Sequence, residues 1–252
     1  MIWEKNLSLC LVVKNDEKHL SDCLQGVRDI VDEIIVVDRG STDKTIEIAE
    51  EAGATVCSLE GRESYSEAKN TCLEHATGRW VLFLEADEAI PAEKHEELKL
   101  LLKNPNVEGY LLHIHQNHED YHISSPVQAL RLFRNRPEYR FQYGVFERIP
   151  KGILNNIHTA DIHLAKKDCP SSAGEAQSDI LSLKEELDRQ PEDGYLQYMY
   201  GMELLNRDSY EESTEYFRKA IQKANPDDLF VPHAYKCFAW ALISLQRYER
   251  AL

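Results

Sequence analysis

The stretch IIVVDRGSTDKT, residues 34–45, decides the fold class of this chain. Its first four residues are apolar, as expected of a strand that is buried on both faces, and the strand stops at Asp38. A turn glycine and hydroxyl side chains follow, and a helix is predicted to start between Ser41 and Asp43. Strand, turn and helix in this order form the repeating unit of an α/β protein.

The same alternation continues on both sides of this stretch. We predict further strands at 8–13, 54–59 and 80–84, and helices over about 20–27, 64–76 (capped by Gly78) and 95–103. Strands that are apolar throughout and alternate with helices indicate a parallel sheet covered by helices on both faces, the doubly wound class. In such sheets, ligands bind beyond the carboxyl ends of the strands.

The alternation breaks after residue 103. Residues 110–115 and 128–134 are predicted strands separated by a polar loop, which indicates an antiparallel or mixed extension of the sheet. Histidines are concentrated here, at positions 113, 115, 118 and 122. A zinc site is the weaker interpretation, because no acidic or cysteine partner has firm metal-ligand spacing. The simpler interpretation is that these histidines line the side of the site that faces an acceptor molecule.

The composition disfavours several classes of protein. Lys and Arg number 29 against 44 Asp and Glu, and the net charge of -15 disfavours nucleic acid and anionic membrane surfaces as partners. No apolar run approaches the roughly 20 residues that cross a bilayer, and the first residues lack the small-residue cleavage pattern of a signal peptide. The 6 cysteines contain no CxxC pair, so no disulfide framework is expected. We expect a cytoplasmic protein without a transmembrane segment.

The last third of the chain has a different character. Residues 166–179 are rich in Ser, Gly, Pro and charge and form the predicted linker. The region 180–252 is helical in pattern. Small and large residues stand near the positions expected of a tetratricopeptide repeat, at Tyr195, Gly201, Phe217 and Ala220. Because a second repeat only begins at residue 247, we expect either an incomplete helical region or a last helix that packs elsewhere.

Three polar clusters lie at the predicted carboxyl ends of the strands, at residues 14–16, 38–43 and 85–87. The third follows the apolar run VLFL, and in extended backbone the side chains two positions apart point the same way. Glu85 and Asp87 are therefore expected to converge on one side of the strand end. A single cluster is as easily a solvated connection, whereas three clusters on one edge of the sheet indicate a binding site.

A nucleoside diphosphate is a ligand that suits this edge. Asp38 can accept hydrogen bonds from a base or ribose, and the turn after it offers backbone N–H groups at a helix start. The negative charge of the diphosphate needs a cation to balance it. Asp87 is the candidate ligand for such a cation, Mg2+ or Mn2+. Glu85 is expected to reach ribose hydroxyls or a water on the metal. The cation would stabilise the charge that grows on the departing diphosphate.

The segments SLCLVVKNDEKHLSDCL, DEIIVVDRGSTDKTIEIAEEAGA and SYSEAKNTCLEHATGRWVLFLEADE follow one another within residues 7–90. In this order and spacing they resemble the nucleotide-binding half of family 2 glycosyltransferases with the GT-A fold. RLFRNRPEYRFQYGVFE at 131–147, with helices behind it, is similar to a bacterial subgroup that includes sublancin-type peptide S-glycosyltransferases. The resemblance implies a Rossmann-like mixed sheet in a GT-A domain over 1–165, followed by TPR-like helical hairpins.

The resemblance also implies roles for individual residues. It carries over Lys14, Asn15, Asp16 and Asp38 as base and ribose contacts, Lys69 near the diphosphate, and Glu85 with Asp87 as the acidic pair. Arg39 and Ser41, in the turn after Asp38, are further predicted contacts to the nucleotide sugar, with Arg39 expected to meet phosphate or uracil. The implied reaction is an inverting transfer from a nucleotide sugar, with a UDP-sugar as the expected donor and a divalent metal at the DxD motif.

Inversion requires a base on the acceptor side of the attacked carbon. Glu147 is the candidate, and the other interpretation is a surface glutamate paired with Arg148. His163 is the second candidate metal ligand, and the other interpretation is a structural histidine between Ile162 and Leu164.

The chain departs from the family pattern at several places. Glu85 replaces the first Asp of DxD, Arg39 stands where many relatives have a small or acidic residue, and Phe146-Glu147 replaces His-Glu. His163-Leu164-Ala165-Lys166 stands where the subgroup has His-x-Gly-Tyr. These departures leave a second interpretation open, a catalytically weakened nucleotide-sugar-binding or scaffold protein. A sugar nucleotidyltransferase is disfavoured, because no Gly-rich basic loop follows the first strand.

The predicted function is thus an inverting, metal-assisted glycosyltransferase that acts on a hydroxyl or thiol of a glycan, peptide or protein. The helical region is expected to present or select the acceptor, since repeat surfaces suit peptides and proteins. A homo-oligomer is left open.

Overall fold

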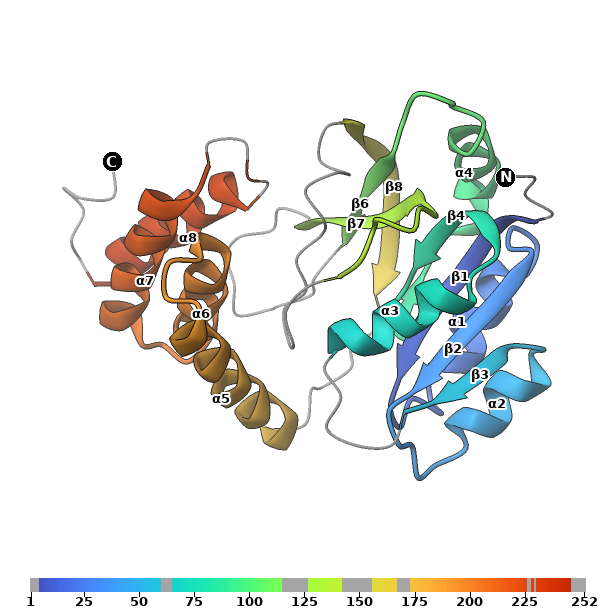
Figure 1. The fold of residues 1–252 in the computed structure, drawn as a ribbon, viewed down its shortest axis with the longest axis horizontal. Coiled ribbons are helices and arrows are strands. Elements are labelled where there is room, and N and C mark those ends of the chain that lie inside the picture. Colours follow the sequence, from blue (N-terminus) through green and yellow to red (C-terminus); the bar gives the residue numbers. More distant parts are fainter. Residues whose placement is uncertain are drawn as a thin grey trace. The chain divides into compact units, whose positions relative to one another are not determined.

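The computed structural model describes residues 5–59, 65–114, 127–141, 156–166, 173–225, 228 and 230–245. These residues fall into two compact units, one that holds the described strands and one that is helical (Figure 1). Among them, no helix has the length and apolar character needed to cross a bilayer.

The first unit alternates strands and helices along the chain, close to the predicted bounds. Its elements are β1 (Lys5–Val13), α1 (Leu20–Val27), β2 (Glu33–Asp38), α2 (Thr45–Glu51), β3 (Thr55–Ser58), α3 (Tyr65–His75), β4 (Gly78–Phe83), β5 (Glu88–Ala89), the 3-10 helix η1 (Ala92–Lys94), α4 (His95–Leu101), β6 (Gly109–Ile114), β7 (Val127–Arg134) and β8 (Ile157–Lys166).

The described strands form one mixed sheet in the order β3-β2-β1-β4-β7-β6-β8-β5. Strand β1 pairs in parallel with β2 and β4, and β2 pairs in parallel with β3. Strand β7 lies antiparallel between β4 and β6. Strand β8 runs parallel to β6 and pairs antiparallel with the short β5. The predicted α/β class with a mixed extension is confirmed.

Strand β8 has no counterpart among the predicted elements. Its buried residues Ala160, Ile162 and Leu164 alternate with more exposed ones, as in a strand with one face on the core. This period of two is the sequence signal that could have revealed it. The strand escapes detection because His and Asp residues interrupt the apolar run by which the other strands are recognised.

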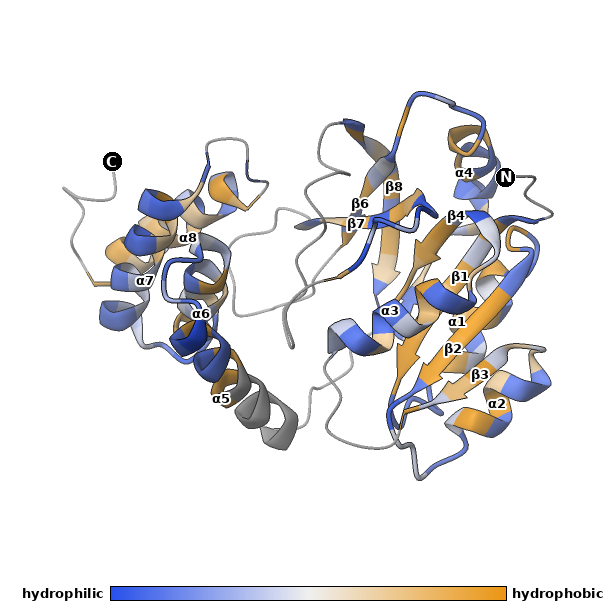
Figure 2. Cartoon of the chain, viewed as in Figure 1, coloured by the Kyte–Doolittle hydropathy of each residue, from blue (hydrophilic) through white to orange (hydrophobic). Residues whose placement is uncertain are grey.

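Alternate residues of β1 point into cores on opposite faces of the sheet. Leu7, Leu9 and Leu11 belong to a core that includes residues of α1, α2 and α4. Cys10 and Val12 belong to a second core with residues of α3. Figure 2 shows β1 and β2 as apolar over most of their length, whereas the helices carry both colours. Burial on both faces explains why these strands read as continuous apolar runs.

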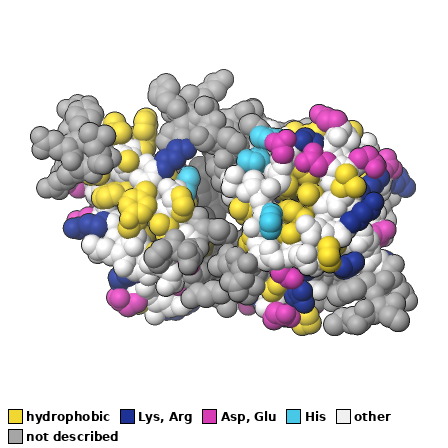
Figure 3. Space-filling model, turned by 90° about the horizontal axis from the view of Figure 1, so that it is seen from above, with side chains coloured by type: hydrophobic (Ala, Val, Ile, Leu, Met, Phe, Trp, Pro, Cys, Tyr) yellow, Lys and Arg dark blue, Asp and Glu magenta, His cyan; other side chains and the backbone are white. Residues whose placement is uncertain are grey.

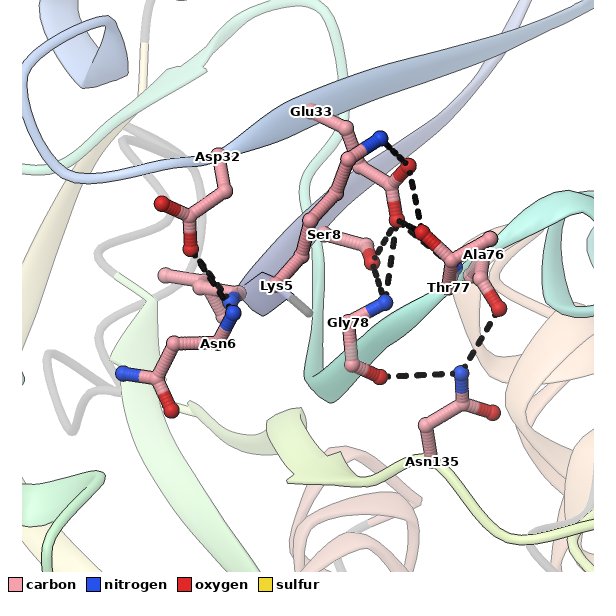
Figure 4. A network of polar contacts seen from close by, with 10 residues as sticks. Lys5, Asn6, Ser8, Asp32, Glu33, Ala76, Thr77, Gly78 and Asn135 are labelled. Atoms are coloured by element: carbon pink, nitrogen blue, oxygen red, sulfur yellow. Dashed lines mark hydrogen bonds and ion pairs between the residues drawn. The ribbon is translucent and has the colours of Figure 1, made fainter. Parts of the chain in front are cut away.

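A polar network joins the amino ends of β1, β2 and β4 (Figure 4). Glu33 Oε1 accepts hydrogen bonds from Ser8 Oγ (2.5 Å), Thr77 N–H (2.6 Å) and Gly78 N–H (3.0 Å). Glu33 Oε2 pairs with Lys5 Nζ at 2.7 Å. Burial raises the pKa of Glu33, but the hydrogen bonds from Lys5, Ser8 and Thr77 outweigh it and lower the pKa to about 2. The network ties three neighbouring parallel strands together.

Gly78 is the first residue of β4, which corrects the prediction that it caps the helix before it. Helix α3 ends at His75. A Cβ atom at Gly78 would lie 2.5 Å from Ser8 Oγ and 2.8 Å from Ser8 N. Glycine is needed here because β4 approaches β1 closely, and not because a helix ends.

The second unit contains α5 (Ala173–Arg189), α6 (Gly194–Asn206), α7 (Tyr210–Lys223) and α8 (Val231–Ser244). A Cβ atom at Gly201 of α6 would lie 3.1 Å from the Phe217 ring of α7, so glycine allows this close packing. Ser213, where a tetratricopeptide repeat usually has alanine, is fully buried. This interlocking of small and large residues agrees with the predicted TPR-like helices. Helix α5 takes up the second half of the predicted linker 166–179, and the domain boundaries stay a prediction.

Candidate active site

Hydrogen bonds join the loops that follow β1 and β2. Asn15 N–H donates to Ser41 Oγ at 2.9 Å, and Thr42 N–H donates to Asn15 Oδ1 at 2.8 Å. Asp16 N–H donates to Thr45 Oγ1 at 2.7 Å. Asn15 has a left-handed backbone, φ 58°, which Asn tolerates better than most residues. The polar loop at 14–16, in which Lys14 is exposed, is thereby fixed against the start of α2.

Asp38 shapes the turn after β2. Its carboxylate is buried and accepts hydrogen bonds from the N–H groups of Gly40 (3.0 Å) and Ser41 (3.1 Å). Helix α2 begins at Thr45, later than predicted, because Ser41 N–H is bound to Asp38 and the Asp43 carboxylate accepts Thr45 N–H at 3.0 Å. Asp38 therefore holds the loop in shape, and its contact to a base or ribose stays a prediction.

Residues Glu85 to Glu88 form a turn, which corrects the extended backbone expected for them. Strand β4 ends at Phe83, and Glu88 N–H donates to Glu85 O at 3.0 Å. Glu85 N–H in turn donates to Glu88 Oε2 at 3.0 Å. The turn and the charged neighbours thus determine where the Glu85 and Asp87 side chains lie, and the alternation of side chains along a strand does not.

Glu85 lies among Tyr65, Lys69 and Arg131. Tyr65 Oη donates to Glu85 Oε2 at 3.2 Å, Arg131 Nη1 donates to Oε1 at 3.4 Å, and Lys69 Nζ lies 4.0 Å from Oε1. Burial raises the pKa of Glu85, but the charges of Lys69, Arg131 and Lys166 lower it below its ordinary value. Glu85 is therefore held as a carboxylate, and its side chain, 29% exposed, can accept hydrogen bonds from hydroxyls of a ligand.

The other two carboxylates of the turn also face cations from other elements. Asp87 Oδ2 lies 3.5 Å from Lys166 Nζ at the end of β8. Arg131 Nη2 of β7 lies 2.7 Å from Glu88 Oε1, and the Glu88 side chain is fully buried. Ion pairs thus connect the acidic turn to β7 and β8.

Lys69 of α3 is buried beside aromatic rings. Its ammonium lies 5.3 to 5.4 Å from the ring centroids of Tyr65, Phe83 and Phe141. The guanidinium of Arg39 lies 5.0 Å from the centroid of the Tyr65 ring. Cation–π contacts of this kind hold a positive charge in place without neutralising it. Tyr65 thus connects the loop after β2 with the cations around the acidic turn.

Asp16 approaches the acidic turn from the loop after β1. Burial raises the pKa of Asp16, a hydrogen bond from Lys14 N–H lowers it, and the charges of Asp87 and Glu85 raise it further. The net pKa of Asp16 is raised, chiefly by burial, and repulsion from the carboxylates of Asp87 and Glu85 adds to the rise. A cation bound among them would relieve that repulsion.

His163, the second candidate metal ligand, lies on β8 with His113 and Asp161 among its neighbours. Its ring stacks on His113 with the centroids 4.5 Å apart, and its Nε2 lies 3.2 Å from Asp161 Oδ1. The residue of β8 that contacts Asp87 is Lys166. Figure 3 shows histidine side chains beside apolar ones on one face of the first unit.

The predicted base Glu147 lies outside the described residues, as do His115, His118 and His122. Its catalytic role therefore stays a prediction, and so does any metal site in the histidine-rich loop.

Four residues that surround the acidic pair had no predicted role in the site, namely Tyr65, Glu88, Arg131 and Lys166. Glu88 directly follows the acidic pair, and this adjacency was an available signal. Arg131 and Lys166 lie in other parts of the sequence. They reach the turn because β7 pairs antiparallel with β4, and the unpredicted β8 pairs antiparallel with β5.

The residues present fit a divalent cation at Asp87. Mg2+ is usually held by one or two carboxylates together with substrate phosphates and waters, and not by an all-protein cage. Within the described ranges, no group of three or more His, Cys, Asp or Glu side chains is placed to hold a metal by itself. Asp87, with Asp16 nearby, offers the oxygen ligands that such a cation prefers, and a diphosphate would complete them.

The chain matches a known protein family. The profile of Glycosyl transferase family 2 matches residues 8–158. A TPR repeat-containing protein of Synechococcus elongatus is 31% identical over 88% of this chain and 58% of its own length. The SPbeta prophage-derived glycosyltransferase SunS of Bacillus subtilis is 24% identical over 84% of this chain and 52% of its own length. The chain thus spans little more than half the length of these relatives.

A solved structure shares the fold. Glucosyl-3-phosphoglycerate synthase from Mycobacterium tuberculosis, in complex with Mn2+, UDP and glucosyl-3-phosphoglycerate, matches with a TM-score of 0.54 and 18% identity over 74% of this chain and 80% of that chain. The likeness is one of fold, and it confirms the expected GT-A architecture. Because the family profile covers more than half of the sequence, the chain belongs to glycosyl transferase family 2.

Proposed function

We propose that this protein transfers a sugar, with inversion and with the help of a divalent metal, from a nucleotide diphosphate sugar to a hydroxyl or thiol acceptor. The observation that carries the proposal is the arrangement beyond the carboxyl ends of the parallel strands. There, Glu85 and Asp87 face the cations Lys69, Arg131 and Lys166. A site of this kind can receive both a diphosphate and a cation.

The donor's nucleoside would lie against the joined loops after β1 and β2. Lys14 and Arg39 present positive charge there, and Glu85 is held ionised to accept hydrogen bonds from ribose hydroxyls. The diphosphate would lie towards Lys69, whose charge is fixed by three aromatic rings. We expect a UDP-sugar as the donor, as the synthase of similar fold was crystallised with UDP.

Asp87 is the proposed protein ligand of Mg2+ or Mn2+. The synthase of similar fold was crystallised with UDP and either Mn2+ or Mg2+. Such a cation supplies a Lewis acid that stabilises the charge developing on a departing diphosphate. This chain's part is to orient Asp87 at the turn 85–88, where Lys166 Nζ lies 3.5 Å from its Oδ2. His163 stays a proposed second ligand.

The acceptor side is proposed from the sequence. Glu147 would take the proton from the attacking hydroxyl or thiol, opposite the leaving diphosphate. The TPR-like helices would present a glycan, peptide or protein acceptor. A cytoplasmic location and a homo-oligomer stay predictions.

The proposal is tested by donor hydrolysis, because glycosyltransferases that lack their acceptor often transfer slowly to water. The protein is incubated with UDP-glucose, UDP-N-acetylglucosamine, UDP-galactose and GDP-mannose, each with Mn2+ or with EDTA, and the released nucleoside diphosphate is measured. We expect release from one of the UDP-sugars that depends on Mn2+. If UDP binds in calorimetry but no donor is hydrolysed or transferred, the result favours the alternative, a nucleotide-sugar-binding protein with weakened catalysis.

A further inference from the structure

Lys166 faces Asp87 in the proposed site, but the proposed reaction gives Lys166 no role of its own. Its ammonium lies 3.5 Å from Asp87 Oδ2, with 33% of the Lys166 side chain and 12% of the Asp87 side chain exposed. The backbone fixes this approach, because Lys166 pairs with Glu88 and Ala165 with Ala89 where β8 meets β5. The strand pairing thus places Lys166 opposite Glu88, the residue that follows Asp87.

The charges around Lys166 explain why it stays near Asp87. Arg131 pairs with both Glu85 and Glu88. Lys69 Nζ lies 4.0 Å from Glu85 Oε1. Asp87 forms an ion pair with Lys166, and the charge of Lys166 also helps to lower the pKa of Glu85. Lys166 therefore balances the charge at the point where the proposed metal needs a carboxylate oxygen.

We propose that Lys166 is a built-in counter-ion of Asp87 that competes with the divalent cation, so that metal binds tightly only together with the donor's diphosphate. The inference rests on the proposed function and deepens it. An ammonium and a divalent cation on one carboxylate repel each other over a few ångströms, which weakens metal binding to the free protein. A diphosphate adds negative charge and gives the ammonium a new partner, which removes the competition.

Competition of this kind makes the two ligands interdependent. If UDP raises the affinity for Mn2+, Mn2+ must raise the affinity for UDP by the same factor. Lys166 would therefore keep the site from holding metal without a donor. It is a positioning residue for the metal, since it acts through Asp87.

The test measures binding of Mn2+ alone, without nucleotide, by the electron paramagnetic resonance signal of free Mn2+. Wild type is compared with Lys166→Met, which keeps the length of the side chain and removes its charge. Lys94→Met serves as the matched control, because Lys94 forms ion pairs with Glu97 and Asp161, and neither of these residues belongs to the acidic turn. Lys166→Arg keeps the charge and should behave like wild type.

We expect Lys166→Met to bind Mn2+ about tenfold more tightly than wild type, which corresponds to about 1.4 kcal/mol, while Lys94→Met is unchanged. The factor by which UDP strengthens Mn2+ binding should shrink in Lys166→Met. Unchanged or weaker Mn2+ binding by a folded Lys166→Met variant, judged by circular dichroism, overturns the inference. If that variant does not fold, Lys166→Gln takes its place in the same titration.

The same experiment separates this inference from the proposed function. Donor hydrolysis by wild type with Mn2+, together with equal Mn2+ affinity in wild type and Lys166→Met, contradicts only the role of Lys166. Absence of Mn2+ binding in every variant, even with UDP, contradicts both the metal site and the counter-ion.

Discussion

The two ends of the parallel strands carry acidic clusters that differ in how closely their carboxylates are bound by other groups of the protein. At the amino ends, Glu33 is surrounded by short hydrogen bonds of 2.5 to 3.0 Å from Ser8, Thr77 and Gly78, and by Lys5 at 2.7 Å. At the carboxyl ends, Glu85 and Asp87 meet their cations at 3.4 to 4.0 Å.

The difference separates a cluster that stabilises the sheet from one that is suited to exchange partners. The short hydrogen bonds of Glu33 satisfy its carboxylate within the protein, so no ligand is needed there. The longer ion pairs of the carboxyl ends can be replaced by a cation or a phosphate at little cost. Both clusters are acidic and adjoin buried strands, and only their partners distinguish them.

Asp87→Asn should have the largest effect, on the rate of donor hydrolysis. The substitution removes the charge that is proposed to hold the metal while keeping the shape of the side chain. We expect a loss of about 10³-fold, or about 4 kcal/mol in activation free energy, measured as UDP released with Mn2+. The free energy of unfolding should change little. A rate within threefold of wild type would show that Asp87 does not serve the reaction.

Arg131→Met should have the largest effect on folding. It leaves Glu88, whose side chain is fully buried, without the guanidinium at 2.7 Å. We expect the free energy of unfolding in urea to fall by about 3 kcal/mol, because an unpaired buried charge is costly. Arg136→Met is the control, since Arg136 is 46% exposed in its pair with Glu108. Adding Glu88→Gln to Arg131→Met should recover part of the loss, and equal losses in both Arg variants would contradict the account.

Glu33→Gln tests the amino-end cluster and should cost about 1 to 2 kcal/mol of stability at pH 7, a figure reduced for solvent screening. The pKa of Glu33 is lowered from the ordinary 4.5 to about 2. Its stabilisation is therefore complete above pH 4.5 and is lost as the pH falls towards 2.

The measurement for Glu33 is urea unfolding of wild type and variant at pH 7 and at pH 3. The difference between the two proteins should narrow at pH 3. Donor hydrolysis at pH 7 should be unchanged, because this cluster lies at the far end of the strands. A constant difference in stability across this pH range would argue against the low pKa. Asp29→Asn, at an exposed position, controls for the loss of a carboxylate.

Lys94→Met should have the smallest effect. Lys94 pairs with Glu97 and with Asp161, whose side chain is 80% exposed, and surface pairs of this kind contribute little to stability because solvent screens them. Its urea midpoint and its donor hydrolysis should both match wild type. A loss of activity here would show that the site extends further along η1 and β8 than proposed.

The sequence predicts the central strands of the fold better than the contacts between side chains within the site. Apolar runs such as 34–37 reveal the central strands because those strands are buried on both faces. Strand β8 stays hidden because only one of its faces meets the core. The position of Gly78 is misread for a related reason, since its close contact with Ser8 comes from a strand pairing and not from the local sequence.

The candidate site shows the same limit. The clusters at 14–16, 38–43 and 85–87 can be placed at one edge of the sheet from the chain alone, because parallel strands share an orientation. The cations Arg131 and Lys166 cannot, because their approach depends on the register of β7 and β8. The turn at 85–88 likewise depends on a hydrogen bond from Glu85 N–H to the Glu88 carboxylate, and no pattern of residue types in the sequence predicts this bond.

Titration calorimetry of UDP with and without Mn2+ tests the central claim most directly, that the carboxyl-end cluster holds a diphosphate and a cation together. We expect Mn2+ to strengthen UDP binding to wild type and to Glu33→Gln by about tenfold or more, and to have no such effect on Asp87→Asn. Equal UDP affinity with and without Mn2+ in wild type, or an undiminished Mn2+ effect in Asp87→Asn, would contradict the account.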